Sequence, residues 1–217
     1  MRKLFVCLMA ICLGLSINVS AQSKTLAKQK AKQEKKEYKQ KVKKYQKEGW
    51  DIFGSSHTLE MALLNHYEAL EKDGVTEVTG YATSANKNIG KDKLMMSACT
   101  AYAQQIGSYI KGRIVEDMGS IVTTEELEEF EHFYAAYENA VKAEIRGELR
   151  PSYTIYRQVS LHGKQVYEFE GHYIVDEAAA SRARIRAFKN AAKESAVAQK
   201  YADSVAQFIN DAEFAED

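Results

Sequence analysis

Residues 153–175 constrain the fold most strongly, because they have the pattern of a β-hairpin. His162-Gly163 suits a two-residue turn, since Gly163 can adopt a positive φ, and the runs on either side are rich in Tyr, Ile, Val and Phe. The turn fixes a register in which like side chains meet like and opposite charges face each other. The expected cross-strand pairs are Val159 with Val166, Arg157 with Glu168, and Tyr156 with Phe169.

The two faces of this hairpin differ in character. The aromatic face carries Tyr156, Tyr167, Phe169, Tyr173 and Val175. The opposite face mixes apolar and charged side chains, namely Ile155, Val159, Val166, Ile174, Arg157, Glu168 and Glu170. The aromatic face needs a cover, which helices on either side of the hairpin in sequence can supply. Core packing is therefore the simpler interpretation; stacking of a flat ligand on Tyr156, Tyr167, Phe169 and Tyr173 is the alternative.

The first residues have the pattern of an export signal. Arg2-Lys3 is the charged region, residues 4–17 are the apolar region, and Val19-Ser20-Ala21 is a small-residue cleavage site. No later stretch approaches the roughly 20 apolar residues that a membrane span needs. We therefore expect an exported protein of the periplasm or the peripheral outer membrane, without a transmembrane span.

The expected domains are a signal peptide over residues 1–21, a Lys-rich arm over 22–48 and one α+β domain over 49–217. Cleavage removes two of the three cysteines, so Cys99 remains alone and no intramolecular disulfide can form. The formal net charge of +0 conceals an asymmetry, with +8 over residues 23–48 and −10 over 49–217. The two parts therefore attract each other or attract different partners.

The Lys-rich arm has only a narrow apolar stripe, which is typical of an exposed, coiled-coil-like basic helix. A solvated helix or a disordered leader is the simpler interpretation, because charge runs are usually solvated faces. The functional alternative is contact with anionic envelope polymers or lipid headgroups. Lysines that could make such contacts are Lys28, Lys32, Lys35, Lys39 and Lys43. Nucleic acid is not an expected partner of an exported protein with an acidic body.

The rest of the chain alternates helical and extended patterns. We expect helices over 59–70, about 92–118 and from Thr123, where Glu126 completes a capping box. Extended segments are expected at 75–83 and 145–149, with a polar loop at 84–91. From Asp176 to about Asn210 the pattern stays helical, and about 52 Å of uninterrupted helix is too long for a body about 40 Å across. This helix must break, with Asn190 as a candidate position, project beyond the sheet or pack against another subunit.

These patterns predict an α+β fold: a small antiparallel sheet of about three strands covered by long helices. Gly80 and Ala82 in the strand at 75–83 indicate that another element packs closely over that face. Four basic residues early in the C-terminal helix are spread around it and are expected to be solvated. They are Arg182, Arg184, Arg186 and Lys189.

A search for catalytic and metal-binding patterns finds none. There is no nucleophile elbow, dinucleotide-binding fingerprint, phosphate loop, His-Glu-x-x-His or Cys-x-x-Cys. His57 and His66 lie on opposite faces of a helix, and His162 and His172 lie about 30 Å apart along the hairpin. Neither pair can share a metal ion. We therefore expect no catalytic residues, no metal site and no cofactor.

Two weaker candidates also favour structural roles. Glu128 and His132 have the spacing of two metal ligands, but a carboxylate in the first turns of a helix beside a surface histidine is the simpler interpretation. Cys99 lies in a helix among small apolar residues, so a buried spacer is a better interpretation than a nucleophile.

Several segments resemble known envelope proteins. Gly80-Tyr81-Ala82 with the alanine-rich residues 91–114, and residues 145–149 running through the hairpin to Asp176, resemble the lipoprotein-twenty family of bacterial envelope proteins. Glu48-Gly49-Trp50 and Thr58-Leu59-Glu60 are similar to segments of uncharacterised exported proteins of Bacteroides-type bacteria. The resemblance implies a helix-covered antiparallel sheet at the cell envelope, without a known catalytic site. The chain departs from the lipoproteins in lacking a lipidation cysteine.

We therefore expect a non-enzymatic envelope protein that acts through contacts with proteins or anionic polymers. The Lys-rich arm, the C-terminal helix or both would make these contacts, and the C-terminal helix could also form a homo-oligomer. The alternative is a small-ligand-binding protein that uses the aromatic hairpin face.

Overall fold

The computed structural model describes residues 36–211, which fall into two units divided between Glu48 and Gly49. In the first unit, residues 36–47 form a helix on which Lys39 and Lys43 are exposed. The other three lysines proposed for surface contacts, Lys28, Lys32 and Lys35, lie outside the described residues. None of the described helices is both long and apolar enough to span a membrane.

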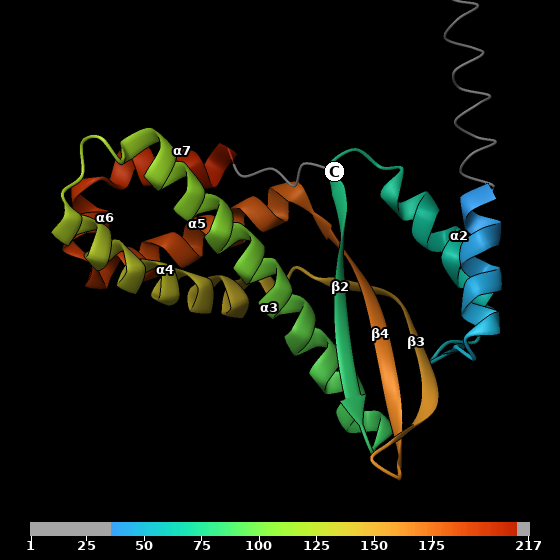
Figure 1. Ribbon diagram of the computed structural model, residues 1–217. Coiled ribbons are helices and arrows are strands. Elements are labelled where there is room, and N and C mark those ends of the chain that lie inside the picture. The colour runs from blue at the N-terminus through green and yellow to red at the C-terminus, as the bar shows by residue number, and fades with distance from the viewer. Residues whose placement is uncertain (1–35, 212–217) are drawn as a thin grey trace, which may run out of the picture. The chain divides into compact units, whose positions relative to one another are not determined.

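The second unit contains a four-stranded antiparallel sheet with the order β1-β3-β4-β2 (Figure 1). The strands are β1 (Asp51–Ile52), β2 (Val75–Ser84), β3 (Arg150–Leu161) and β4 (Lys164–Asp176). Strands β3 and β4 form the predicted hairpin in the predicted register, with Gly163 at a φ of 76° in the turn. The expected sheet is confirmed, with the two-residue β1 as an additional edge strand.

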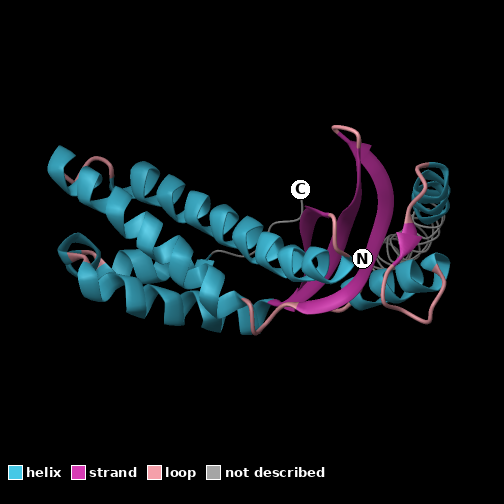
Figure 2. Ribbon diagram, turned by 90° about the horizontal axis from the view of Figure 1, so that it is seen from below, coloured by secondary structure: helices cyan, strands magenta, loops and turns pink. Residues whose placement is uncertain are grey.

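Helices lie on both faces of this sheet. The helix α2 (Leu59–Leu70) contacts β2 and β3, whereas α3 (Lys87–Arg113) contacts β2 and β4 on the opposite face (Figure 2). Beyond the sheet, α3 continues into a π-helix (Ile114–Met118) and packs on α4 (Thr124–Ile145) and α7 (Ala202–Asp211). Helices α5 (Glu177–Ala191) and α6 (Ala196–Lys200), which a 3-10 turn (Ala192–Glu194) joins, pack on α4.

The close approach of α3 to the sheet depends on glycine. A Cβ atom on Gly80 would lie 2.4 Å from the backbone oxygen of Leu94 and 3.0 Å from the backbone nitrogen of Ala98. A Cβ atom on Gly171, the partner of Gly80 across β2 and β4, would lie 3.2 Å from Leu94 Cδ1. The predicted close packing over Gly80 is therefore present, and α3 supplies it.

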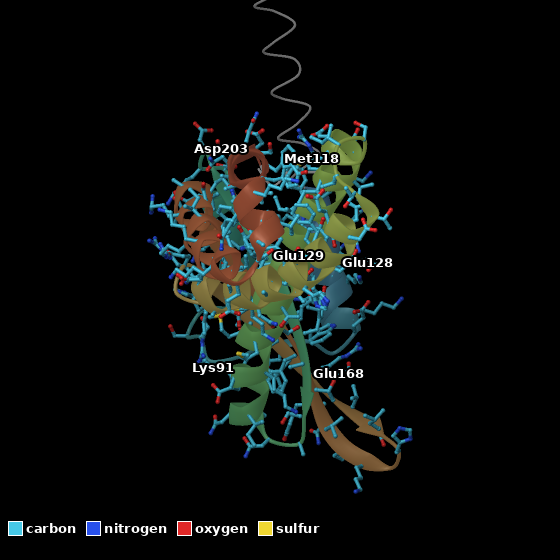
Figure 3. The ribbon with its side chains drawn as sticks, turned by 90° about the vertical axis from the view of Figure 1, so that its left-hand side faces the viewer. Lys91, Met118, Glu128, Glu129, Glu168 and Asp203 are labelled. Carbon is cyan, nitrogen blue, oxygen red and sulfur yellow. The ribbon has the colours of Figure 1, made fainter. Side chains whose placement is uncertain are left out.

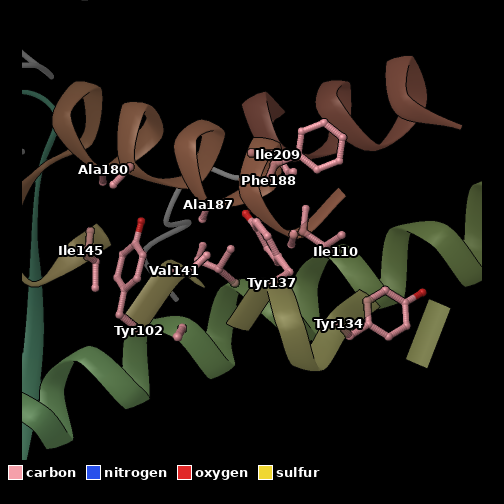
Figure 4. Close-up of a cluster of buried hydrophobic side chains, with 14 of the residues drawn as sticks. Tyr102, Ile110, Tyr134, Tyr137, Val141, Ile145, Ala180, Ala187, Phe188 and Ile209 are labelled. Carbon is pink, nitrogen blue, oxygen red and sulfur yellow. The ribbon is translucent and has the colours of Figure 1, made fainter. Parts of the chain in front are cut away.

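The core continues between α3, α4 and α5 (Figure 4). Tyr102 of α3 and Tyr137 of α4 are fully buried there, beside Val141 and the small side chains of Ala180 and Ala187. The alanines let α5 lie close to α4, while the tyrosines fill the space between the helices. Burial raises the pKa of Tyr102 to about 12, although the nearby Arg184 acts to lower it.

Arg184 corrects the expectation that the basic residues of the C-terminal helix are solvated. Its side chain is fully buried, donates a 2.8 Å hydrogen bond to the Tyr102 hydroxyl and pairs with the Glu177 carboxylate. By contrast, Arg186 is exposed and pairs with Glu144 and Glu148 on α4 and the turn after it. The spacing of charged residues around the helix gives no information on tertiary contacts. It therefore could not predict that Arg184 binds the Tyr102 hydroxyl and the Glu177 carboxylate in the core.

Other segments also differ from expectation. Helix α3 begins at Lys87, inside the predicted loop, because the Asn86 side chain accepts hydrogen bonds from the backbone nitrogens of Asn88 and Ile89. Residues 145–149 are not extended, since α4 continues to Ile145 and a turn follows. The C-terminal helix does break: a 3-10 turn ends at Glu194, and Ser195 caps the next helix. The capping box at Thr123 is present as predicted.

Substitution by alanine should have opposite effects on the stability of the fold at Gly80 in β2 and at Gly112 in α3. Gly80→Ala should destabilise the fold by about 1 to 3 kcal/mol, because its methyl group meets the α3 backbone. Gly112→Ala should stabilise it by about 0.5 to 1 kcal/mol, because Gly112 lies in α3 with no other atoms within 4 Å of the new methyl. Denaturant unfolding measures both, and an undiminished stability of Gly80→Ala would contradict the close packing.

A second prediction concerns the buried arginine. Arg184→Ala should lower the free energy of unfolding by about 3 kcal/mol, because it removes one partner of a buried pair and leaves a cavity. Arg186→Ala is the matched control, since exposed ion pairs contribute little. Equal stability of the two variants in urea would show that Arg184 does not hold α5 against α3.

Candidate metal centre

Three potential metal ligands converge on the face of the sheet opposite α3. The side chains of His66, Glu77 and His172 each place one ligand atom within 4.8 Å of the others. They come from α2, β2 and β4 respectively. We call these three residues the His-Glu-His cluster. In the part of the chain that the structure describes, no other group of three His, Cys, Asp or Glu residues meets this criterion.

The buried face of α2 positions His66. Thr58 caps this helix through a hydrogen bond from the Met61 backbone nitrogen to its hydroxyl. His66 follows Leu59 by seven residues and Leu63 by three, so all three lie on the same helical face, and all three are buried. His66 thus lies on the apolar stripe by which α2 packs on the sheet, so its imidazole is placed against the sheet.

Strand alternation positions the other two ligands. Val78 and Gly80 of β2 face α3, so Glu77 and Thr79 point to the α2 side. His172 of β4 pairs with Thr79 across the ladder, which makes Glu77 its diagonal neighbour. The carboxylate and the imidazole are therefore brought together by the register of β2 on β4.

A β-bulge in β3 completes the surroundings of the cluster. The register shifts between Pro151, which pairs with Tyr173, and Tyr153, which pairs with His172. Ser152 is the extra residue, and its Oγ lies 2.9 Å from His66 Nδ1. The Tyr153 ring stacks on the His172 ring at a centroid distance of 4.1 Å and an interplanar angle of 9°. Bulges often redirect a side chain next to a functional site.

Both histidines are therefore held by the ring nitrogen that points away from the cluster. His66 contacts Ser152 through Nδ1, and His172 contacts Glu170 through Nε2 at 2.9 Å. The inward nitrogens are Nε2 of His66 and Nδ1 of His172, and both face Glu77 Oε1. Metal-binding histidines typically donate their outer N–H to a carboxylate, carbonyl or water, which fixes the tautomer and the ring orientation.

The electrostatics of the cluster keep Glu77 ionised. Burial acts to raise the pKa of its carboxyl, but close polar contacts and charge interactions with His172 and His66 outweigh burial and hold the pKa well below its usual range. Glu77 is thus an anionic oxygen donor at neutral pH. Together with Glu170, it places two negative charges around the imidazoles, which matches the charge of a divalent cation.

One atom of the cluster lacks a hydrogen bond. Nε2 of His66, in a fully buried side chain, lies 3.3 Å from Glu77 Oε1 but makes no hydrogen bond. In a tetrahedral site with metal–ligand distances of about 2.0 to 2.2 Å, neighbouring ligand atoms are about 3.3 to 3.6 Å apart. The spacing of this pair thus matches one edge of such a site. The Nδ1 contact of His172 with Glu77 is closer and would lengthen when an ion enters.

The histidine pairs compared in the sequence do not meet in the structure. His57 is exposed in the loop before α2, and His162 is exposed in the hairpin turn. The pair that does meet is His66 with His172, whose ring centroids lie 5.7 Å apart. That combination was missed because it joins a helix and a strand distant in sequence. No spacing motif links these residues, although a buried position for His66 could have been inferred from the α2 stripe.

The aromatic hairpin face lies on the α3 side, away from the cluster. Phe169 and Tyr173 are buried in the core, and Phe53 packs edge-on against Phe169 at a centroid distance of 5.6 Å. Tyr156 and Tyr167 are half-buried beneath Lys87, whose Nζ lies 4.1 and 4.9 Å from their ring centroids. Stacking of a ligand on this face stays a prediction.

The remaining candidates occupy ordinary positions. Glu128 and His132 are both exposed on α4, and Figure 3 shows Glu128 beside Glu129 on that helix. Glu129 Oε1 accepts a 3.1 Å hydrogen bond from the Val197 backbone nitrogen at the start of α6. Cys99 is fully buried in α3, and burial raises the pKa of its thiol, so the thiolate needed for nucleophilic chemistry is disfavoured.

We expect the cluster to contribute to stability even without metal. In the presence of a chelator, Glu77→Gln should lower the free energy of unfolding by about 1.5 to 3 kcal/mol, because a charged acceptor shared by two buried histidines is lost. The matched control is Glu68→Gln on the exposed side of α2, which should change it by less than about 0.5 kcal/mol. Equal values from denaturant unfolding would show that Glu77 does not tie α2 to the sheet.

Comparisons with known proteins do not assign the site. No protein-family model matches the chain, and searches of curated proteins and of solved structures find no match. The resemblance to lipoprotein-twenty proteins therefore stays a prediction. The interpretation of the cluster rests on its own geometry and chemistry.

Proposed function

We propose that the protein binds one divalent transition-metal ion through His66 Nε2, Glu77 Oε1 and His172 Nδ1. The observation that supports this most strongly is the convergence of these three atoms while Ser152 and Glu170 hold the outward nitrogens. A purely structural hydrogen-bond network does not require both imidazoles to present a nitrogen to the same carboxylate oxygen. A metal site does require its donor atoms to converge on one point, as these three atoms do.

The donor set favours particular ions. Imidazole nitrogen suits zinc, copper, iron and nickel, whereas calcium and magnesium prefer oxygen ligands. Two histidines and one carboxylate are a known ligand set for zinc, with a fourth position for water or another ligand. We therefore take Zn²⁺ as the representative ion and expect Ca²⁺ and Mg²⁺ to bind far more weakly.

This function fits the expected location without depending on it. Export, association with the envelope and the absence of catalysis stay predictions, as does polymer binding by the Lys-rich arm. A metal-binding protein of the envelope could store, deliver or be stabilised by its ion. The proposal is limited to binding, because three ligands and an open position are compatible with each of these roles.

The proposal predicts a single zinc site that depends on the cluster. Isothermal titration should give one Zn²⁺ per chain, and Glu77→Gln or His66→Gln should weaken binding by about 100-fold or more, since loss of an outer partner alone typically costs 10 to 100-fold. His132→Gln, which removes an exposed histidine on α4, should leave the affinity unchanged. Ca²⁺ at the same concentration should give no heat of binding at this site.

Binding should also stabilise the fold. At a free Zn²⁺ concentration about 100 times the dissociation constant, the gain is about 2.7 kcal/mol. For a domain of this size, that gain corresponds to a rise in Tm of about 5 to 11 °C. An unchanged Tm for the wild type, or an equal rise for Glu77→Gln, would contradict the site.

A further inference from the structure

The turn end of the β3–β4 hairpin projects beyond the rest of the sheet. Strand β2 ends at Ser84, which pairs with Tyr167, and β1 pairs only with residues 155–156. Residues 159–166 therefore pair only with one another in the described sheet, and Figures 1 and 3 show this turn beyond the ends of β2 and α3. We call residues 159–166 the projecting ribbon. It extends about 10 Å past Tyr167, since its three residue pairs add about 3.3 Å each.

The projecting ribbon has one apolar face and one polar face. Val159 and Val166 are paired across the ladder, and Leu161 follows Val159 by two residues, so all three lie on the same face. The valines are half-buried and Leu161 is 49% exposed, and none of the three belongs to the hydrophobic core of the described residues. The opposite face carries Ser160 and Gln165. Apolar side chains that are grouped outside the core in this way indicate an interaction surface.

This surface is separate from the His-Glu-His cluster. On the same face of β4, Glu170 and Glu168 lie between His172 and the projecting ribbon, and they line a pocket of about 400 Å³ together with Trp50 and Arg157. The ribbon therefore shares no residue with the cluster, and a function of the ribbon does not need the metal ion.

Basic side chains lie around the projecting ribbon. Helix α3 begins beside the residues from which the ribbon extends, because Nζ of Lys87 lies 4.1 and 4.9 Å from the ring centroids of Tyr156 and Tyr167. Ile89, in the first turn of α3, is 53% exposed. Residues 84–93 and 159–166 together contain four lysines and one aspartate, for a formal net charge of +3. The lysines are Lys87, Lys91, Lys93 and Lys164, and all except the half-buried Lys87 are exposed.

The positive charge at this end contrasts with the rest of the second unit. Residues 49–217 carry −10, and residues 114–145, which follow the other end of α3, contain nine acidic residues and one lysine. The 27 residues of α3 separate these two ends by about 40 Å. The dipole of a helix favours acidic residues in its first turn, yet α3 has none there. The lysines are therefore not explained by the stability of α3, and their charge favours an anionic partner.

We propose that the projecting ribbon docks on the surface of an anionic lipid membrane. Leu161 would enter the headgroup region to the depth of about 5 to 10 Å that is typical of interfacial segments. Since the ribbon is about as long as this depth, the lysines of α3 would then lie at the level of the lipid phosphates. A membrane fits this end because the apolar group projects from the unit and the lysines come from two elements, so the partner has to be broad. Apolar burial and attraction to anionic headgroups add at such a surface.

The test places a tryptophan at the tip of the ribbon. Leu161→Trp and the control Ile121→Trp, before α4, each add an indole at an exposed apolar position, and the wild type gives the contribution of the single native tryptophan. Vesicles of equal parts phosphatidylglycerol and phosphatidylcholine should shift the emission of Leu161→Trp to shorter wavelength, with at least about tenfold higher affinity than pure phosphatidylcholine vesicles. Brominated lipid should quench this emission, and high salt should reverse the shift. Ile121→Trp should show neither the shift nor the quenching.

Charge and apolar variants locate the docking surface. In the Leu161→Trp protein, Lys91→Gln with Lys164→Gln should weaken vesicle binding by about tenfold or more. The matched control, Lys189→Gln with Lys193→Gln, removes the same charge at exposed positions and should change binding by less than about twofold, because distant charges are screened. In the wild type, Leu161→Ser should weaken co-sedimentation with the anionic vesicles by about tenfold. Unfolding in urea checks that each variant keeps its fold.

The outcomes also separate this surface from the Lys-rich arm. If the full chain sediments with anionic vesicles while the emission of Leu161→Trp stays unchanged, another part of the chain binds the lipid and the proposal is wrong. Equal affinity for pure phosphatidylcholine vesicles would overturn it too, as would an equal shift with dextran sulfate, which would indicate an anionic polymer. The titrations contain a chelator, and Glu77→Gln should dock like the wild type, so failure of the metal site leaves the result unaffected.

Discussion

The structure of the second unit depends on the pairing register of β4, one of the two central strands of its sheet. Along β4, Phe169, Gly171 and Tyr173 face α3, while Glu170 and His172 face the other side. Because side chains alternate with a period of two, a slip by one residue would put the charged residues into the core and the aromatic residues outside. The apolar packing under α3 therefore also fixes the positions of the polar groups on the α2 side.

The polar side chains on the α2 side form a candidate site only together with two other features, helix α2 and the bulge in β3. The apolar face of α2 carries His66 onto the sheet, and the bulge at Ser152 supplies a partner for its outer nitrogen. Glu170 belongs to both the cluster and the pocket beside it, since it contacts His172 and lines the pocket that contains Trp50. A single strand thus contributes to the core, to the candidate metal centre and to the neighbouring pocket.

Much of this fold follows from local sequence signals. The turn at Gly163 fixed the hairpin register, the glycine in β2 indicated the close approach of α3, and the capping box at Thr123 located the start of α4. These signals are reliable because each is local. It depends either on residues close together in the chain, as in the capping box, or on the backbone or space requirement of a single glycine.

The candidate site could not be found in the same way. Its contacts join residues that are 86 and 95 positions apart, His66 with Ser152 and Glu77 with His172. Only the docking of α2 on the sheet brings them together, and no periodicity encodes which face of the sheet a helix covers. The buried Arg184 was missed for the same reason, since its partner Tyr102 is 82 positions away.

The most direct measurement is anomalous diffraction at the zinc absorption edge from crystals of the protein grown with Zn²⁺. We predict one strong peak about 2.0 to 2.2 Å from His66 Nε2, Glu77 Oε1 and His172 Nδ1, with the outer nitrogens still bound to Ser152 and Glu170. A fully occupied zinc ion elsewhere on the surface, with the cluster unchanged and without a peak, would contradict it.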